Sequence, residues 1–286
     1  MRAIVRLSAQ RYHRAMFTKA IVRPPASNFA EGLTTAGLGP PDYGLALKQH
    51  DAYCAALERC GLGLIRLVAD SNYPDSCFVE DTAVMVNAPS SSKADVDRLG
   101  HIAVLTEPGA TSRVGEVETI RTVFQQVLPE NAIHQIETPG TLDGGDVCEA
   151  GKHYFIGLSA RTNESGAEQL AGFLADHGYT SSFVNIRDID SLLHLKSGLA
   201  YLGDNRVVVT EALAGRKEFA NFEQIMVPPG EDYAANCVKV NDYVLIAAGY
   251  EQLASKLRQL GYKTLAIDMS EFQKMDGGLS CLSLRW

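Results

Sequence analysis

One pattern recurs along this chain of 286 residues and constrains its fold more than any other feature. A polar residue at the end of a loop is followed by an apolar strand, a tight polar turn and a second strand. The turns carry Gly, Asn and Asp, as at Gly203, Asp204 and Asn205, because these residues tolerate the positive φ of β-hairpins. The pattern recurs in five stretches, which span residues 77–86, 141–159, 192–210, 233–249 and 277–286.

Amphipathic segments lie between these predicted hairpins. Apolar residues recur at intervals of three and four in residues 43–60, 115–128, 164–177 and 250–260, which predicts helices. Each unit then reads as a ββαβ repeat of about 40 to 65 residues, too small to bury a core alone. Five units bury a core together when they are arranged radially, and the last strand, ending at Trp286, closes the ring beside the first unit. We therefore expect an α/β fold, a five-bladed propeller of ββαβ repeats with pseudo-five-fold symmetry.

Linkers mark the boundaries between domains, and the sequence contains no evident linker. The Ser/Pro cluster at residues 88–93 and the turn at residues 228–230 have the length of loops. We predict a single catalytic domain over residues 16–286. Residues 1–15 hold four arginines and no acidic residue but lack the apolar stretch of a secretory signal. A disordered N-terminal extension is the prediction for them, although their composition also suits a transit peptide.

Charge and cysteine content narrow the class of partner. The formal net charge of -8 repels a phosphate backbone, which argues against nucleic-acid binding. No uncharged apolar run approaches the length of about 18 residues that a membrane span needs. The six cysteines include no C-x-x-C pair, so neither a disulfide framework nor a structural zinc site is indicated, and a reducing cytoplasm fits best. The expected partner is a small molecule, and a homodimer remains open.

Polar residues at equivalent positions of a radial repeat converge near its axis. Many carboxylates, few cations and one histidine favour a cationic ligand there. The candidates for this inward-facing set are Asp75, Glu80, Asp81, Asp143, Asp146, His194, Asn236, Asp276 and Cys281.

Cys281 is the candidate nucleophile of this set. It follows Gly277 and Gly278, which free the backbone to approach a ligand closely. A reactive thiol needs a partner that transfers protons, and His194 is the histidine placed for it, with Asp143 as the acid that orients the imidazole. An inert buried cysteine and a turn-forming aspartate explain the same residues, and spacing does not separate these interpretations.

Several ordered segments make the chain recognisable. It resembles the bacterial type of dimethylarginine dimethylaminohydrolase over nearly all of residues 16–286, and the similar segments include YPDSCFVED, EPGATSRVGE, GTLDGGDV, LHLKSGLAYL and KMDGGLSCLSLRW. The resemblance implies the five-bladed α/β propeller of the guanidino-group-modifying enzymes. It also implies that Cys281 is the nucleophile, that His194 donates and accepts protons, and that Asp143 orients it. Some members of the family carry Glu at the position of Asp143.

The resemblance implies substrate contacts as well. Carboxylates would face the guanidinium, arginines would face the α-carboxylate, and backbone groups on a lid would close over the amino-acid end. These roles fall on Asp75, Glu80 and Asp81, on Arg113 and Arg161, and on Leu33 and Met275 respectively. A guanidinium and a carboxylate each pair well with groups that form directed, charge-assisted bonds, so the residue types suit the roles. Asp276 either holds the guanidinium or shapes its turn.

The implied reaction is hydrolysis of N-omega-methylated arginines to L-citrulline and dimethylamine or methylamine, through a thiouronium on Cys281 and without metal or cofactor. Arginine deiminases carry an acid two residues after the catalytic histidine, where this chain has Lys196, so methylated substrates are favoured. The alternatives are an arginine or agmatine deiminase that releases ammonia, a protein that sequesters cationic amino acids, and a zinc-binding protein. Arg113 and Arg161 argue against agmatine, which has no carboxylate.

Overall fold

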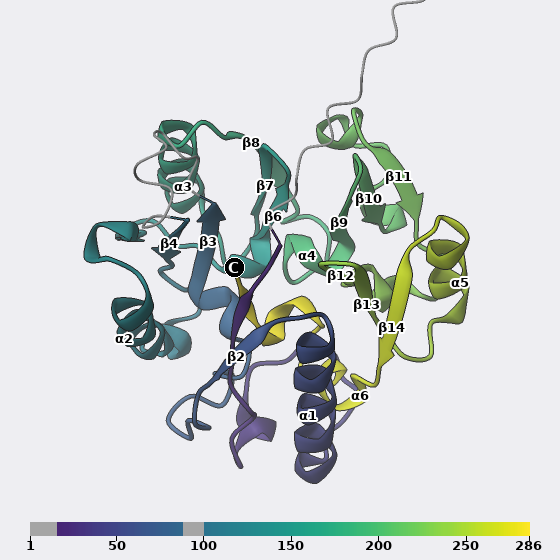
Figure 1. The fold of residues 1–286 in the computed structure, drawn as a ribbon, viewed down its shortest axis with the longest axis horizontal. Coiled ribbons are helices and arrows are strands. Elements are labelled where there is room, and N and C mark those ends of the chain that lie inside the picture. Colours follow the sequence, from purple (N-terminus) through teal and green to yellow (C-terminus); the bar gives the residue numbers. More distant parts are fainter. Residues whose placement is uncertain (1–15, 88–99) are drawn as a thin grey trace, which may run out of the picture.

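The structure is a computed structural model, and it describes residues 16–87 and 100–286. The predicted extension at residues 1–15 and the Ser/Pro cluster at residues 88–93 lie outside the described residues. Within the described part of the chain, the strands form five separate three-stranded sheets. Figure 1 shows these sheets around the middle of the molecule, with the longer helices on the outside.

The sheets share one construction. In four of them, a hairpin is followed by a third strand that pairs in parallel with the hairpin's second strand. These four sheets contain β3 (Ala83–Asn87), β4 (His101–Leu105) and β5 (Ile133–Gln135); β6 (Val147–Ala150), β7 (His153–Leu158) and β8 (Thr180–Asn185); β9 (Leu199–Gly203), β10 (Arg206–Val209) and β11 (Glu223–Met226); and β12 (Val238–Val240), β13 (Tyr243–Ala247) and β14 (Lys263–Ile267).

The fifth sheet joins the two ends of the described chain. Its middle strand, β1 (Lys19–Val22), runs parallel to β2 (Gly63–Arg66) and antiparallel to β15 (Leu284–Arg285), with Ile21 opposite Leu284. Trp286 extends this pairing, since its carbonyl accepts from the backbone N–H of Lys19 and its N–H donates to the Lys19 carbonyl. The prediction that the last strand pairs beside the first unit is confirmed.

The hairpin turns adopt the conformation that their residues predict. Asp204, Asn205 and Asn241 have φ values of 52°, 61° and 51°, and Gly151 has a φ of 72°. Asn and Asp tolerate this left-handed region because their short polar side chains bond to the local backbone, and glycine has no Cβ to clash. The turn chemistry therefore determines where each pair of strands reverses.

Four longer helices cover the sheets: α1 (Tyr43–Arg59), α2 (Glu116–Val127), α3 (Glu164–Asp176) and α5 (Glu251–Gln259). The side chain of Asn163 accepts a hydrogen bond from Gly166 N and so begins α3, whose buried face carries Leu170 and Leu174. The unit of β9 to β11 differs from the prediction of a helix in every repeat. Two short 3-10 turns, at Glu211–Leu213 and Lys217–Phe219, replace the helix there.

No helix within residues 16–87 and 100–286 is both long enough and apolar enough to cross a lipid bilayer. Two short helices complete the described fold, α4 (Leu195–Gly198) and α6 (Ser270–Gln273). Figure 1 shows α4 among the inner ends of the sheets, directly after the predicted catalytic histidine.

Candidate active site

One cavity gathers most of the residues predicted for the site. We call it the front cavity, and it is lined by Leu33, Asp75, Phe78, Asp81, Arg113, Arg161, Leu193, His194, Met275, Asp276, Gly277 and Cys281. Of the residues predicted for the site, Glu80, Asp143, Asp146 and Asn236 are absent from this set. The lining residues come from segments about 250 positions apart in sequence, which the radial arrangement of the sheets brings together.

Cys281 lies in a 3-10 turn, Ser280–Leu282, that follows the glycine pair of residues 277–278. The backbone N–H of Gly278 donates to its sulfur at 3.4 Å. Burial and the negative charges of Glu80 and Asp81 raise the pKa of the Cys281 thiol to about 12. The thiol is therefore protonated at neutral pH until a positive charge arrives beside it.

The side chains of His194 and Asp143 form a hydrogen bond. The distance between His194 Nε2 and Asp143 Oδ2 is 3.0 Å, and the other carboxylate oxygen of Asp143 accepts from Gly109 N at 2.9 Å. Asp143 is completely buried and does not line the front cavity, so it contacts the cavity through the imidazole. This is the geometry of an acid that orients a histidine.

The protonation of His194 is set by the acids around it. Burial disfavours the charged imidazolium, but Asp81, the hydrogen bond with Asp143 and the charge of Asp146 outweigh it and raise the pKa of His194 to about 9. Asp146 is held in place by Ser159 and Thr162, whose hydroxyls donate to it at 2.6 and 2.7 Å. His194 is therefore an imidazolium at neutral pH and is ready to act as an acid.

Arg113 lies in the wall of the front cavity, where protein groups already occupy most of its guanidinium. Its Nη1 pairs with Asp81 Oδ2 at 2.6 Å, and its Nη2 bonds to Glu116 Oε2 at 2.8 Å and to the Phe78 carbonyl at 3.0 Å. The predicted contact of Arg113 with a substrate carboxylate thus competes with two buried acids. Glu116 was not predicted, although an acid three residues after an arginine at a helix start is a signal that could have indicated it.

Arg161 has the opposite environment. Its side chain is partly exposed and forms no ion pair within residues 16–87 and 100–286. Burial raises the pKa of the nearby Asp75 carboxyl, and the positive charge of Arg161 acts in the opposite direction. Of the two predicted arginines, Arg161 is the one whose guanidinium is available to a ligand.

The loop at residues 33–35, which the resemblance predicts to be a lid, is held by two of the predicted acids. The backbone N–H of Leu33 donates to both oxygens of Asp75 at 3.1 Å. Asp276 Oδ2 accepts from Thr35 N at 2.5 Å and from its hydroxyl at 3.0 Å. Asp276 was predicted to hold a guanidinium or to shape its turn; it has a φ of 56° in that turn and also anchors the lid.

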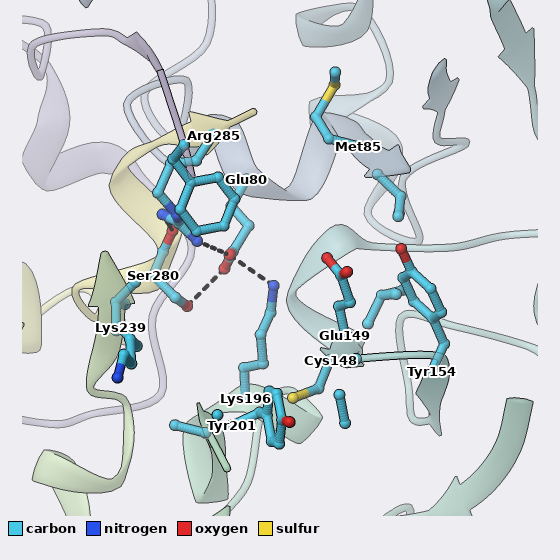
Figure 2. Close-up of a pocket in the computed structure, with 18 of the residues that line it drawn as sticks. Glu80, Met85, Cys148, Glu149, Tyr154, Lys196, Tyr201, Lys239, Ser280 and Arg285 are labelled. Carbon is cyan, nitrogen blue, oxygen red and sulfur yellow. Dashed lines mark hydrogen bonds and ion pairs between the residues drawn. The ribbon is translucent and has the colours of Figure 1, made fainter. Parts of the chain in front are cut away.

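The structure places Glu80 outside the lining of the front cavity. Its side chain points away from the front cavity and toward two cations (Figure 2). Glu80 Oε1 lies 2.6 Å from Lys196 Nζ and 3.2 Å from Arg285 Nη2, and Glu80 Oε2 accepts from the Ser280 hydroxyl at 2.6 Å. Lys196 and Arg285 already pair with this carboxylate, so a substrate guanidinium would compete with two cations for it, and the contact stays a prediction. Adjacent residues of this short turn point to opposite sides, and Asp81 takes the front position.

Lys196, which stands where arginine deiminases carry an acid, does not line the front cavity. It lines a second cavity of about 930 Å³ on the other side of Glu80. We call this the rear cavity. Its lining includes Glu80, Lys196, Ser280 and Arg285 and the inner strands of the sheets.

Asp81, Asp143 and His194 also have the spacing of a metal site, since one ligand atom of each lies within 4.8 Å of the others. However, the carboxylate oxygens of Asp81 already bond to Arg113 at 2.6 Å and to Gly145 N at 2.9 Å. A guanidinium next to this group repels a metal cation. The cluster therefore suits proton transfer better than metal binding.

Known proteins give an independent view of the chain. It is 41% identical to N(G),N(G)-dimethylarginine dimethylaminohydrolase of Pseudomonas aeruginosa, over 95% of this chain and 100% of that protein. It is 32% identical to the protein of the same name from Streptomyces coelicolor, over 93% of this chain and 96% of the other. No family model matches the sequence.

Solved structures agree with these relatives. A cysteine-to-serine variant of the Pseudomonas aeruginosa enzyme, complexed with citrulline, superimposes with a TM-score of 0.85 at 41% identity, covering 95% of this chain and all of that one. The N-terminal domain of ArgZ, a cyanobacterial arginine dihydrolase, shares the fold with a TM-score of 0.78 at 18% identity.

The five small mixed sheets and these matches define the class of protein. It is a hydrolase whose α/β fold is built from five small mixed sheets. Within that class, the chain belongs to the dimethylarginine dimethylaminohydrolase family.

Proposed function

We propose that this chain hydrolyses N-omega-methylated arginines to L-citrulline and dimethylamine or methylamine. The observation that carries the proposal is the front cavity, where the Cys281 thiol and the His194 imidazole share one space with Asp81 and an available arginine, Arg161. The names of the relatives and the citrulline complex of the Pseudomonas aeruginosa enzyme support the same chemistry.

The proposal includes the frame that holds this cavity. Residues 16–286 would form a single catalytic domain, a five-bladed propeller with pseudo-five-fold symmetry, and the ring closure between β15 and β1 supports that architecture. A homodimer and a cytoplasmic location stay predictions.

The substrate would lie with its amino-acid end under the lid. Arg161 offers a forked guanidinium to the α-carboxylate, and the Asp75 carboxylate beside the Leu33 backbone suits the α-ammonium. Met275 would pack against the aliphatic part of the substrate. The substrate guanidinium would then reach Asp81, next to Cys281 and His194. In this arrangement Arg113 acts on the substrate indirectly, because it holds Asp81 in place.

The first half of the reaction begins with a protonated thiol and an imidazolium. The bound guanidinium supplies the positive charge that stabilises a thiolate, and the thiol proton leaves to solvent. The sulfur attacks the central guanidinium carbon and gives a neutral tetrahedral adduct. His194 donates its proton to the methylated nitrogen, the carbon–nitrogen bond breaks, and dimethylamine departs. A cationic thiouronium remains on Cys281.

The second half uses the same imidazole as a base. Neutral His194 accepts a proton from water, and the resulting hydroxyl group bonds to the thiouronium carbon. The carbon–sulfur bond then breaks and the carbonyl of citrulline forms, while its hydroxyl proton returns to the leaving sulfur. One histidine serves both half reactions because it alternates between its two protonation states.

An assay of the purified protein tests the proposal. Asymmetric dimethylarginine, monomethylarginine, arginine and agmatine are offered separately, and released amine and ammonia are measured separately. We expect citrulline and amine from the methylated substrates, and no turnover of agmatine, which lacks a carboxylate for Arg161. Ammonia from arginine as the main activity would favour the arginine deiminase alternative.

A cysteine variant completes this test. Cys281→Ser should lower citrulline formation by about 1,000-fold or more, because a hydroxyl is a far weaker nucleophile than a thiolate. Cys60→Ser, at the end of α1, is the matched control and should keep the activity. Undiminished turnover by Cys281→Ser would remove the nucleophile assignment.

A further inference from the structure

Arg113 lies between two buried acids in the wall of the front cavity. Its Nη1 bonds to Asp81 Oδ2 at 2.6 Å, and its Nε and Nη2 bond to the carboxylate oxygens of Glu116 at 2.8 to 3.2 Å. The carbonyl oxygens of Phe78 and Asp75 accept from Nη2 at 3.0 and 3.4 Å. Every nitrogen of this guanidinium is bonded to the protein, so Arg113 holds the two carboxylates at fixed positions on either side of it.

The position of Glu116 follows from the start of helix α2. Glu116 is the first residue of the helix and follows Gly115, where a Cβ would clash with the Tyr73 hydroxyl. The helix can therefore begin at this place because residue 115 has no side chain. The first turn of a helix favours a negative charge, and only 1% of Glu116 is exposed. Glu116 is thus a buried acid directed at Arg113 and not at solvent.

The two acids and the arginine carry one negative charge in mildly alkaline solution. Burial raises the pKa of Glu116 to about 7, and the charge of Arg113 opposes part of this rise. Burial also acts to raise the pKa of Asp81, but the charges of His194 and Arg113 outweigh it and lower this pKa to about 2. Above pH 7 both acids are negative and the guanidinium stays positive.

Other charges near Glu116 have partners of their own. Arg23 is buried and its charge acts on Glu116, but its Nη1 lies 3.9 Å from Asp70 Oδ2. Asp75 is the proposed partner of the α-ammonium group of the substrate. The balance of charge beside the proposed guanidinium position therefore depends on Arg113 and its two acids.

Arg113 without Glu116 would oppose substrate binding. Asp81 is the proposed partner of the substrate guanidinium, and the positive charge that disfavours a metal ion beside Asp81 would also disfavour a cationic substrate. The carboxylate of Glu116 offsets this charge from the other side of Arg113. Asp81 then keeps one negative charge that Arg113 does not balance, which matches the single positive charge of a guanidinium.

We propose that Glu116 is a positioning residue of this site. Acting through Arg113, it offsets the charge of that arginine and gives the front cavity its preference for a cationic side chain over a neutral one of similar shape. This inference rests on the proposed function. The preference has a use in the reaction, because the substrate is cationic and citrulline is neutral, so the cavity binds the substrate and releases the product.

Binding measurements with two ligands test the proposal. Asymmetric dimethylarginine and citrulline share their amino-acid end and differ in the charge of the other end. Their Kd values are measured by calorimetry at pH 8, in a Cys281→Ser background that prevents turnover. Glu116→Gln removes the charge and nearly keeps the shape, so we expect the Kd of asymmetric dimethylarginine to rise by about tenfold. The Kd of citrulline should change by less than about twofold.

Glu118→Gln is the matched control for this substitution. It removes the same charge from the same helix, but the Glu118 side chain is 74% exposed and pairs with Arg121. Water and salt screen a charge at such a position. Neither Kd should change in this control.

A double variant separates charge from shape. Arg113→Gln/Glu116→Gln removes one positive and one negative charge, so Asp81 again leaves one negative charge beside the ligand. Both ligands bind more weakly if the cavity loses its shape, but the ratio of their Kd values should return to within about threefold of the unmodified ratio. This variant leaves no buried charge of the pair unpaired, so it tests the proposal even if Glu116→Gln does not fold.

The opposing outcomes are distinct. Equal weakening of both ligands in Glu116→Gln, or no change in either, would overturn the proposal, because the preference for a cation would not depend on the charge of Glu116. A double variant whose ratio of Kd values differs from the unmodified ratio by tenfold or more would overturn it as well. Failure of the unmodified protein to release any amine from asymmetric dimethylarginine would instead reject the proposed function.

Discussion

At Cys281, the charges of the surroundings work against a reactive thiol in the free protein. Burial and the charges of Glu80 and Asp81 raise the pKa of the thiol, and Lys196 opposes them only in part, so the pKa is about 12. Asp81, together with Asp143 and Asp146, also stabilises the imidazolium of His194. The resting site therefore holds a neutral thiol and a charged imidazole, and a cationic ligand is what converts the thiol into a nucleophile.

This arrangement predicts the dependence of kcat, which reports the enzyme–substrate complex, on pH. Activity rises with pH as the thiol loses its proton in the presence of substrate. It falls again near pH 9, where His194, with a pKa of about 9, loses the proton that the leaving amine needs. A pH profile with asymmetric dimethylarginine measures both limbs. A falling limb near the ordinary histidine pKa of about 6.5 contradicts the stabilised imidazolium.

Asp143 gives a second prediction at the residue scale. Asp143→Asn keeps the shape of the side chain but removes the charge that supports the imidazolium, so kcat should fall by about 100-fold. Asp143→Glu restores the carboxylate and should recover activity to within about tenfold of the unmodified protein. Steady-state kinetics at a fixed pH compares the two variants. Equal losses in both would mean that Asp143 only shapes the turn before Gly144.

Single residues also show the limit of sequence reasoning. The pattern of repeats predicted that Cys281, His194 and Asp81 converge, and they line one cavity. It did not show that Glu80 and Asp81 line different cavities, because the directions of adjacent side chains depend on the local backbone. The engagement of Arg113 by Glu116 depends in the same way on packing that no spacing reveals.

At the scale of elements, the lid depends on the close approach of its backbone to an acid. A Cβ at Gly32 would lie 2.4 Å from Asp75 Oδ1 and 3.3 Å from the terminal methyl of Met275. The backbone of Gly32, with a φ of -66°, suits any residue, so the requirement for glycine is one of space. The lid can fasten to Asp75 because position 32 has no side chain.

Gly32→Ala should therefore weaken closure of the lid. Displacement of Asp75 loses the bonds from Leu33, worth about 1 kcal/mol each, so KM for asymmetric dimethylarginine should rise by about tenfold or more. Gly172→Ala is a suitable control, because a Cβ there meets nothing within 4 Å and lies in helix α3. A KM for Gly32→Ala equal to that of this control would show that the lid closes without help from Asp75.

The sequence predicts some helices and strands more clearly than others. The hairpins carried their signal in turn residues such as Asp204 and Asn241, and the long helices carried theirs in periodic apolar residues such as Leu170 and Leu174. The 3-10 turns that replace a helix between β10 and β11 are too short for any period, so the expectation of a helix in every repeat was wrong there.

At the scale of the whole molecule, both ends of the described chain meet in one sheet, and this closure holds the segment that carries Cys281. Trp286 bonds to the β1 backbone and packs against Phe124, with ring centroids 6.0 Å apart. The sequence predicted this pairing from the position of the last apolar strand. It did not predict the rear cavity, because the volume inside a ring depends on how far the inner side chains reach.

Trp286→Ala tests how much the closure contributes. Loss of a large, nearly buried aromatic side chain should lower the free energy of unfolding by about 3 to 5 kcal/mol. Urea unfolding measures this loss. Alkylation of Cys281 by iodoacetamide should also quicken, because its turn is less restrained. An unchanged unfolding midpoint together with unchanged alkylation would show that the ring holds without its last residue.

The covalent state of Cys281 during turnover tests the account most directly. Acid-quenched samples taken at intervals after mixing with asymmetric dimethylarginine are digested, and the mass of the Cys281 peptide is measured. The account predicts a transient increase equal to the mass of the substrate less dimethylamine, with amine released before citrulline. An unmodified Cys281 peptide at every time while citrulline forms at its full rate, or an adduct on another cysteine, would contradict it.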